Sequence, residues 1–183
     1  HAEGRYAGKQ AVRFIMDNNN LPNVSNLDEV KAKCLKPVDT YGASCKFTTD
    51  PEINPNYILP MQFMFRLQKI MDEYAGGVVS GFKTSKALCE RGLELLAMLK
   101  EDAEKMGAKD RYDPERCWEN YQRLWQAEAH VRTILFREET RWPGYYFRAD
   151  CPKMDETNWK VFVNCAYKNG QWEMKKVPVV PIG

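Results

Sequence analysis

Four ionisable side chains lie close together between positions 128 and 139, in a stretch with a helical pattern. Glu128, His130, Glu138 and Glu139 are of the types that act as general acids and bases. A carboxylate near an imidazole could move a proton during a reaction. The alternative is ion pairing, because Glu128 and Arg132 are four positions apart and share one face of a helix. The spacing favours ion pairs over catalysis.

Positive and aromatic side chains dominate the next stretch, positions 139–159. Its three cations could bind an anionic ligand, or could pair with neighbouring acids and fix an irregular segment. Its aromatic side chains could stack on a base, although packing against helices is favoured. The cations are Arg141, Arg148 and Lys153, the acids are Asp150, Asp155 and Glu156, and the aromatics are Trp142, Tyr145, Tyr146 and Phe147.

The cysteines and histidines do not have the spacing of a metal site. The chain has six cysteines, and no two are closer than 11 positions. Zinc and iron–sulfur sites in proteins commonly include a close pair such as C-x-x-C. Only two histidines are present. We therefore expect no metal bound by this chain alone, and reduced thiols in a cytoplasmic protein rather than disulfides.

The composition is that of a folded protein with balanced charge. Hydrophobic residues make up 44% and aromatic residues 12% of the 183 positions, enough for a core. The net charge is +2 and both signs alternate along the chain, so nothing points to nucleic acid. We find no apolar run of membrane-spanning length. The sequence has no nucleophile elbow, phosphate-binding loop or dinucleotide-binding glycine pattern.

Hydrophobic periodicity predicts a mainly α fold. Helices are expected over 4–17, from Ser25 to about 38, from Pro60 to about 75, from about 85 to 106, and from Asp113 to about Arg141. Pro60 and Pro114 suit the first turn of a helix. In the third helix we expect the buried face to include Met61, Met64, Phe65, Met71 and either Gln68 or Leu67. The segment 42–59 is too rich in proline for regular structure.

A β-hairpin is predicted at the end of the chain. Asn169-Gly170 supplies the two positive-φ positions of a type I′ turn. Val161, Val163, Cys165 and Tyr167 alternate with Phe162, Asn164 and Ala166 before it. An isolated hairpin is marginally stable in water, so it must dock on the helices, on a partner or on a sheet outside this chain.

Nine positions at fixed spacing resemble a protein family. They follow the pattern E-S/T-R-x-x-G-x-x-x-R-x-D-x-P-x-x-D-x-x-x-W, which flavoprotein subunits of the fumarate reductase and succinate dehydrogenase superfamily carry late in their chains. The positions here are Glu139, Thr140, Arg141, Gly144, Arg148, Asp150, Pro152, Asp155 and Trp159. The helix "LQKIMDEYAGGV" also looks like one that opens the C-terminal helical domain of that family.

Longer stretches resemble one branch of the family, the alpha subunits of dissimilatory adenylylsulfate reductases. They include "NPNYILP", "LELLAMLKEDAEKM" and "RCWENYQRLWQAEAHVRTILFREETRWPGYYFRADCPKMDETNW". The resemblance implies a helical bundle like the C-terminal part of fumarate reductase flavoproteins, with a β-hairpin extension. It also implies that "HAEGR" is the first turn of a helix facing the flavin. On this basis His1, Ala2 and Glu3 are expected near FAD, and no catalytic residue is assigned here.

The resemblance implies an oxidoreductase that interconverts adenylylsulfate with sulfite and AMP. FAD would serve the full-length subunit, and iron–sulfur clusters would belong only to a partner beta subunit. This chain would support the flavin domain and dock the beta subunit. The aromatic segment at positions 139–159 would pack on the helices and on either the flavin domain or the beta subunit. Two alternatives stay open, namely a non-catalytic helical interaction module and a flavoprotein fragment acting on fumarate or succinate. Alone, the fragment is expected to be inactive.

The same reading predicts how the chain is divided. Positions 1–20 would be the last helix of an FAD-binding domain that lies before His1. Positions 21–142 would form the helical domain. Positions 143–183 would hold the aromatic segment and the hairpin.

Overall fold

The computed structural model describes residues 2–18, 25–38, 49–110, 112–142, 144 and 146–180. The chain divides into two units, His1–Lys36 and Pro37–Gly183. The first unit contains helix α1, Ala2–Asp17, and most of helix α2, Leu27–Val38. The apolar side chains of α1 are exposed, and Tyr6 and Phe14 keep 66% and 62% of their surface accessible. The helical period predicted for this segment is confirmed.

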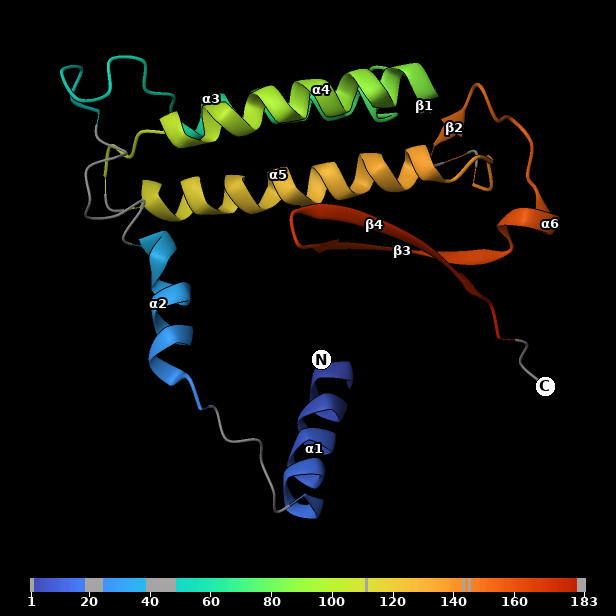
Figure 1. Ribbon diagram of the computed structural model, residues 1–183, viewed down its shortest axis with the longest axis horizontal. Coiled ribbons are helices and arrows are strands. Elements are labelled where there is room, and N and C mark those ends of the chain that lie inside the picture. Colours follow the sequence, from blue (N-terminus) through green and yellow to red (C-terminus); the bar gives the residue numbers. More distant parts are fainter. Residues whose placement is uncertain are drawn as a thin grey trace. The chain divides into compact units, whose positions relative to one another are not determined.

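Three helices form the core of the second unit. They are α3, Pro60–Tyr74; α4, Lys86–Asp102, extended by the short 3-10 helix η2, Ala103–Lys105; and α5, Asp113–Phe136. Figure 1 shows α4 and α5 running side by side. The core residues that they share include Phe63, Leu67, Leu96, Leu124 and Val131. Each large apolar side chain buried in this way contributes about 1.5–3 kcal/mol.

Local signals explain where these helices begin. Pro60 and Pro114 lie in the first turns of α3 and α5, where the missing N–H of proline costs no hydrogen bond. Ser85 precedes α4, and its Oγ accepts a hydrogen bond from the N–H of Leu88 at 3.3 Å. Gln62 plays a similar part for α3, since its Oε1 accepts from the N–H of Leu59 at 2.9 Å.

Two details of the predicted helices were wrong. The buried residues of α3 are Pro60, Phe63 and Leu67, and Met71 packs against the core. Leu67 and Met71 were predicted, whereas Met61 and Phe65 are 60% and 62% exposed. The buried face is rotated relative to the predicted one, because Phe63 and Leu67 are the side chains of α3 that pack against α4 and α5. Helix α5 ends at Phe136, five residues before Arg141. It ends there because the buried side chain of Arg148 donates hydrogen bonds to its last carbonyl groups.

Of the remaining elements, β1 lies between α3 and α4, and the others follow α5. Strand β1, Lys83–Thr84, pairs in parallel with strand β2, Phe147–Arg148. A short helix α6, Glu156–Trp159, then leads into strands β3, Val161–Lys168, and β4, Gln171–Pro178, which pair antiparallel. Figure 1 shows this hairpin beside α5, on the side away from α4. The predicted hairpin is therefore confirmed, with Asn169 and Gly170 at φ values of 50° and 81°.

The hairpin docks on the helices through an aromatic cluster. Trp125 of α5 contacts Tyr167 and Trp172, with ring centroids 4.8 and 5.9 Å apart. Edge-to-face and tilted aromatic pairs of this kind add about 0.5–1.5 kcal/mol to the burial of their surface. The hairpin thus finds a partner inside the chain itself.

Candidate functional site at the end of the long helix

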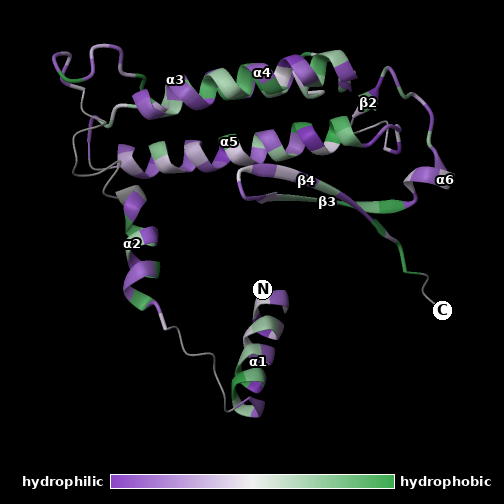
Figure 2. Cartoon of the chain, in the orientation of Figure 1, coloured by the Kyte–Doolittle hydropathy of each residue, from purple (hydrophilic) through white to green (hydrophobic). Residues whose placement is uncertain are grey.

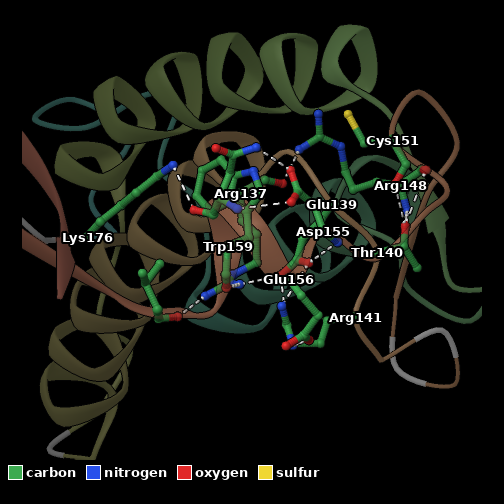
Figure 3. A network of polar contacts seen from close by, with 12 residues as sticks. Arg137, Glu139, Thr140, Arg141, Arg148, Cys151, Asp155, Glu156, Trp159 and Lys176 are labelled. Carbon is green, nitrogen blue, oxygen red and sulfur yellow. Dashed lines mark hydrogen bonds and ion pairs between the residues drawn. The ribbon is translucent and has the colours of Figure 1, made fainter. Parts of the chain in front are cut away.

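Glu139 lies at the centre of the candidate site and is fully buried. Its carboxylate accepts hydrogen bonds from the guanidinium groups of Arg137 and Arg141 and from the N–H of Asp155. The distances from Arg141 Nε and Asp155 N are 2.7 and 2.9 Å. Burial by itself would raise the pKa of Glu139, but these hydrogen bonds outweigh it and hold the pKa below its ordinary value. Figure 3 shows the arrangement.

Arg141 extends this network toward α6. Its Nη1 donates to Glu156 at 2.6 Å while its other nitrogens bind Glu139. Asp155 caps α6, because its Oδ1 accepts from the N–H groups of Thr157 and Asn158, both at 2.9 Å. The fixed spacing of Glu139, Arg141 and Asp155 is therefore the spacing needed to hold the start of α6 against the end of α5.

Arg148 closes the end of α5 from inside the protein, with 1% of its surface exposed. Its Nη1 donates to the carbonyl oxygens of Ile134, Leu135 and Arg137. The last carbonyls of a helix have no partner within the helix, and a guanidinium near a helix C-terminus also offsets the negative end of its dipole. This capping explains why α5 ends at Phe136.

Asp150 neutralises Arg148 and ties it to α4. It receives two hydrogen bonds from Arg148, from Nε at 2.9 Å and from Nη2 at 2.7 Å. A third comes from the N–H of Lys86 at 3.1 Å, at the start of α4. The hydrogen bond from Arg148 is the main reason that the pKa of Asp150 falls to about 2.

Thr140 and Trp159 complete the network. The hydroxyl of Thr140 accepts from the N–H of Arg148 at 3.0 Å and donates to the carbonyl of Cys151 at 2.8 Å. Trp159 is buried and packs edge-on against Phe136, with ring centroids 5.6 Å apart. We call this set of contacts the helix-end clamp: Arg137, Glu139, Thr140, Arg141, Arg148, Asp150, Asp155, Glu156 and Trp159.

The clamp has little capacity for acid–base chemistry. Every oxygen of Glu139 is bound by a cation or an amide, and a lowered pKa makes a weak base. Glu128 is similar, since it accepts from Arg132 at 2.9 Å, Lys100 at 3.2 Å and Trp172 Nε1 at 2.7 Å. Burial would raise the pKa of Glu128, and the hydrogen bonds from Arg132 and Lys100 reverse that effect. The ion pair predicted between Glu128 and Arg132 is confirmed.

The structure does not gather the predicted aromatic residues into one stacking surface. Trp142 is 65% exposed, whereas Tyr146 packs on the core of the helices. Phe147 lies in β2, and its N–H bonds the carbonyl of Phe82 at 2.7 Å. Tyr145 lies outside the described residues. Lys153 is exposed and contributes its carbonyl oxygen, which accepts from the N–H of Thr140 at 3.2 Å.

The three residues expected near FAD stand at the start of the first unit, and α1 begins at the second of them. His1 lies outside the described residues, and nothing is described of the side chain of Ala2. Glu3 is exposed in the first turn of α1. Their assignment to FAD stays a prediction.

The described part of the chain contains no group of three metal-ligating side chains placed to hold an ion. Its five cysteines, Cys34, Cys89, Cys117, Cys151 and Cys165, are free thiols. Within the same residues, each helix is too short or too polar to cross a membrane.

The clamp does not identify a protein family, whereas comparison with known proteins shows what the chain is similar to. No protein-family model matches the chain. The alpha subunit of adenylylsulfate reductase from Megalodesulfovibrio gigas is 45% identical to it over 177 residues. These residues are 96% of this chain and 27% of that subunit. The solved adenylylsulfate reductase of Archaeoglobus fulgidus is 46% identical, with a TM-score of 0.79 over 98% of this chain and 28% of the matched chain.

The chain is homologous to part of the adenylylsulfate reductase alpha subunit. It spans just over a quarter of the length of these relatives. A second solved adenylylsulfate reductase, in complex with sulfite as a covalent adduct, matches equally well, with 46% identity and a TM-score of 0.79. The resemblance to adenylylsulfate reductase alpha subunits, which was drawn from the longer sequence stretches, is confirmed.

The wider fold is confirmed by a more distant relative. The FrdA chain of E. coli quinol fumarate reductase superposes with a TM-score of 0.72 over 96% of this chain, at 17% identity. At that identity the likeness concerns the fold alone. The mainly α architecture of this chain, with its C-terminal hairpin, therefore matches part of a solved fumarate reductase chain in fold.

Proposed function

We propose that the chain works as part of an adenylylsulfate reductase alpha subunit, an oxidoreductase that interconverts adenylylsulfate with sulfite and AMP. The observation that carries the proposal is the 45% identity over nearly the whole chain. The identity to a fumarate reductase chain is only 17%. This difference favours adenylylsulfate over fumarate or succinate as the substrate.

FAD is the cofactor of the proposed activity, and the described residues offer it no more than the start of α1. The first N–H groups of a helix lack partners within it and attract negative charge. We assign His1, Ala2 and Glu3 to the edge of the FAD site because "HAEGR" resembles the flavin-facing first turn of a helix in this family. The chain has no glycine-rich dinucleotide motif, so the rest of the subunit must hold most of the cofactor. When bound, FAD supplies the two-electron chemistry.

The residues of this chain have a supporting role in the proposal. The helix-end clamp fixes α5, α6 and the β1–β2 pair in one arrangement, and Asp150 links it to α4. A rigid set of helices can then support a flavin domain and present a surface to an iron–sulfur beta subunit. The clusters that pass electrons would belong to that partner.

The proposal also includes a division of the chain and a location. Positions 1–20 would belong to the FAD-binding domain, 21–142 to the helical domain, and 143–183 to the aromatic segment and hairpin. We place the enzyme in the cytoplasm, and the free state of the five described cysteines supports a reducing compartment.

An absorbance spectrum of the purified protein with its co-purifying chains, together with the intact mass of each chain, tests the proposal. We expect a flavin band with a broad iron–sulfur shoulder, and AMP formation from adenylylsulfate when a reductant is supplied. A colourless sample with no such activity, whatever chains it contains, would contradict the proposal. The non-catalytic interaction module would then be the better account.

A further inference from the structure

Five aromatic rings contact one another in a row between the core of the helices and solvent. Three of them lie at positions 118, 121 and 125 of α5, a spacing that places them on one face of the helix. The other two face each other across the hairpin, one on β3 and one on β4. Consecutive ring centroids are between 4.8 and 6.4 Å apart. We call this set the five-ring array: Trp118, Tyr121, Trp125, Tyr167 and Trp172.

The two ends of the array lie in different surroundings. Trp118 and Tyr121 pack against the hydrophobic core, and their rings are stacked at an interplanar angle of 16°. At the other end Tyr167 is 46% exposed. Trp125 joins the ends, because its ring contacts both Tyr121 and Tyr167. Electrons that step from ring to ring along the array would therefore cross between the surface and the core.

Packing alone does not explain the composition of the array. Each of its rings is a tryptophan or a tyrosine, although the chain has eight phenylalanines. Figure 2 shows the hydrophobic residues at the open end of the hairpin, where β3 begins and the chain leaves β4. Tyr167 and Trp172 lie at the opposite end, next to the turn. Tryptophan and tyrosine are also the aromatic side chains that give up one electron most readily, whereas phenylalanine does not.

Glu128 provides a proton acceptor for one ring of the array. Its Oε1 accepts a hydrogen bond from Nε1 of Trp172 at 2.7 Å. Burial raises the pKa of Glu128, but hydrogen bonds from Arg132 and Lys100 outweigh burial and lower it, so Glu128 is ionised at neutral pH. It is a weak base toward ordinary acids. The N–H of an oxidised tryptophan is a far stronger acid than that of the neutral ring, so Glu128 can take this proton and return it.

A cation makes Trp125 an unfavourable place for a radical to remain. Nζ of Lys100 lies 3.6 Å from the centroid of the Trp125 ring. A positive charge beside a ring opposes the removal of an electron from it. The guanidinium of Arg132 is farther from the ring of Trp172, at 5.7 Å, and Glu128 offsets its charge. We therefore expect an oxidation to pass through Trp125 and to end at Trp172 and Tyr167.

We propose that the five-ring array carries one-electron oxidation from the core to Tyr167, where a small-molecule thiol in solution reverses it. An oxygen-centred radical takes one electron from Trp118. Electrons then step from ring to ring toward Trp118, until Tyr167 has lost one electron and its hydroxyl proton. The oxygen-centred radical has gained one electron and one proton and becomes a hydroxy compound. The thiol returns a hydrogen atom to Tyr167 and becomes a thiyl radical.

The need for such a path rests on the proposed function. Reduced flavins react with dioxygen to form peroxide, and iron from iron–sulfur clusters converts peroxide into oxygen-centred radicals. An enzyme that works with both groups is exposed to these radicals. The path itself rests on the ring contacts of this chain.

The test starts an oxidation at the core end of the array in the assembled enzyme. A ruthenium polypyridyl photo-oxidant is attached through Glu115→Cys, at an exposed position of α5 three residues before Trp118. A soluble electron acceptor and a light flash generate the oxidant, and a nitroxide traps the radical that forms on Tyr167. Peptide mass spectrometry measures this label. The same treatment of the enzyme with Glu115 unchanged gives the background of direct oxidation, which is subtracted.

Trp125→Phe keeps an aromatic ring in place but removes its capacity to be oxidised. We expect it to lower the labelling of Tyr167 about tenfold. The matched control is Trp142→Phe, at a tryptophan that is 65% exposed and outside the array, and we expect less than a twofold change. Equal labelling in the wild type and Trp125→Phe, or equal losses in the two variants, would overturn the proposal.

A second measurement tests the proton acceptor. In Tyr167→Phe the oxidation should stop at Trp172, where transient absorption distinguishes a neutral tryptophan radical from its cation. We expect the neutral radical with Glu128 present and the cation with Glu128→Gln. The same form of the radical in both proteins would overturn the role of Glu128.

Flavin content and AMP formation from adenylylsulfate, measured on the same preparation, separate this proposal from the proposed function. An active enzyme whose labelling ignores Trp125 refutes the array alone. An inactive sample with Trp125-dependent labelling refutes the proposed activity alone.

Discussion

Two glutamates near α5 hold together two different regions of the molecule. Glu139 in the helix-end clamp is fully buried, and its partners Arg137, Arg141 and Asp155 lie within 16 positions. Glu128 beneath the hairpin keeps 15% of its side chain exposed. It joins segments far apart in sequence, since Lys100 and Trp172 are 28 and 44 positions away.

This difference explains why the clamp carries a sequence motif and the contact under the hairpin does not. The clamp orders one continuous segment, so its residues must stand at fixed spacing, and this spacing is what the nine-position pattern records. The contact under the hairpin depends on tertiary packing, and no spacing rule marks it. We expect the clamp to carry more stability for each side chain than the hairpin contact, because its charges are more deeply buried.

The largest effect is expected at Arg148. Arg148→Met keeps much of the side-chain volume but leaves Asp150 and the last carbonyls of α5 without their donor. Breaking a buried ion pair by removing one partner costs about 3–5 kcal/mol. The loss should appear in the free energy of unfolding measured with urea.

The control for Arg148 is an exposed arginine of the same helical unit. Arg91 is about half exposed and pairs with Glu94, and exposed pairs contribute about 0–1 kcal/mol. Equal losses in the free energy of unfolding for Arg148→Met and Arg91→Met would show that the clamp stabilises the fold no more than an exposed ion pair does.

The second effect is a dependence of stability on pH through Asp150. Its pKa is about 2 in the folded protein, below the value of about 3.9 for an unfolded chain. A lowered pKa stabilises the folded state above pH 4, and this contribution is lost as the pH falls from about 4 to about 2. Because about a third of the Asp150 side chain is exposed, solvent screening reduces this contribution to about 1.5 kcal/mol.

Urea unfolding of the wild type and Asp150→Asn at pH 5 and pH 2.5 measures this contribution. The wild type should lose about 1 kcal/mol more than the variant over this interval. Parallel losses in the two proteins would show that the ion pair between Asp150 and Arg148 does not stabilise the fold.

The smallest effect is expected beneath the hairpin. Trp172→Phe keeps an aromatic ring beside Trp125 but removes the N–H that bonds Glu128. Glu128 retains Lys100 and Arg132, so the loss should be about 1 kcal/mol. Combining this change with Glu128→Gln in a double-mutant cycle isolates the pair, and a coupling near zero would contradict the contact.

Features that depend on neighbouring residues were easier to predict from the sequence than features that depend on tertiary packing. The hairpin was predictable because Asn169-Gly170 specifies its turn. For the clamp, the pairing of Arg141 and Arg148 with nearby acids was one of two readings of the sequence, and the burial of Glu139 was not predicted. The end of α5 was not predictable, since Arg148 lies beyond the helix and ends it through its side chain. Cation–π contacts such as Lys100 over Trp125, at 3.6 Å, depend on the packing of two helices and leave no local pattern.

The face of α3 was mispredicted for a related reason. Met61, Phe65 and Phe63 are all apolar, so periodicity alone does not choose between two overlapping faces. Only the positions of α4 and α5 decide that Phe63 is buried and Phe65 exposed. The exposed face of α3 is therefore a feature that a pattern assigns wrongly to a core.

The central claim is that Glu139 and its arginines are structural and take no part in proton transfer. Glu139→Gln in the assembled enzyme tests it, with the free energy of unfolding and kcat per bound flavin measured on one preparation. We predict a loss of stability of at least about 2 kcal/mol, with kcat and its pH profile unchanged. A fall in kcat of a hundredfold or more at unchanged stability would contradict the claim and make Glu139 a catalytic residue.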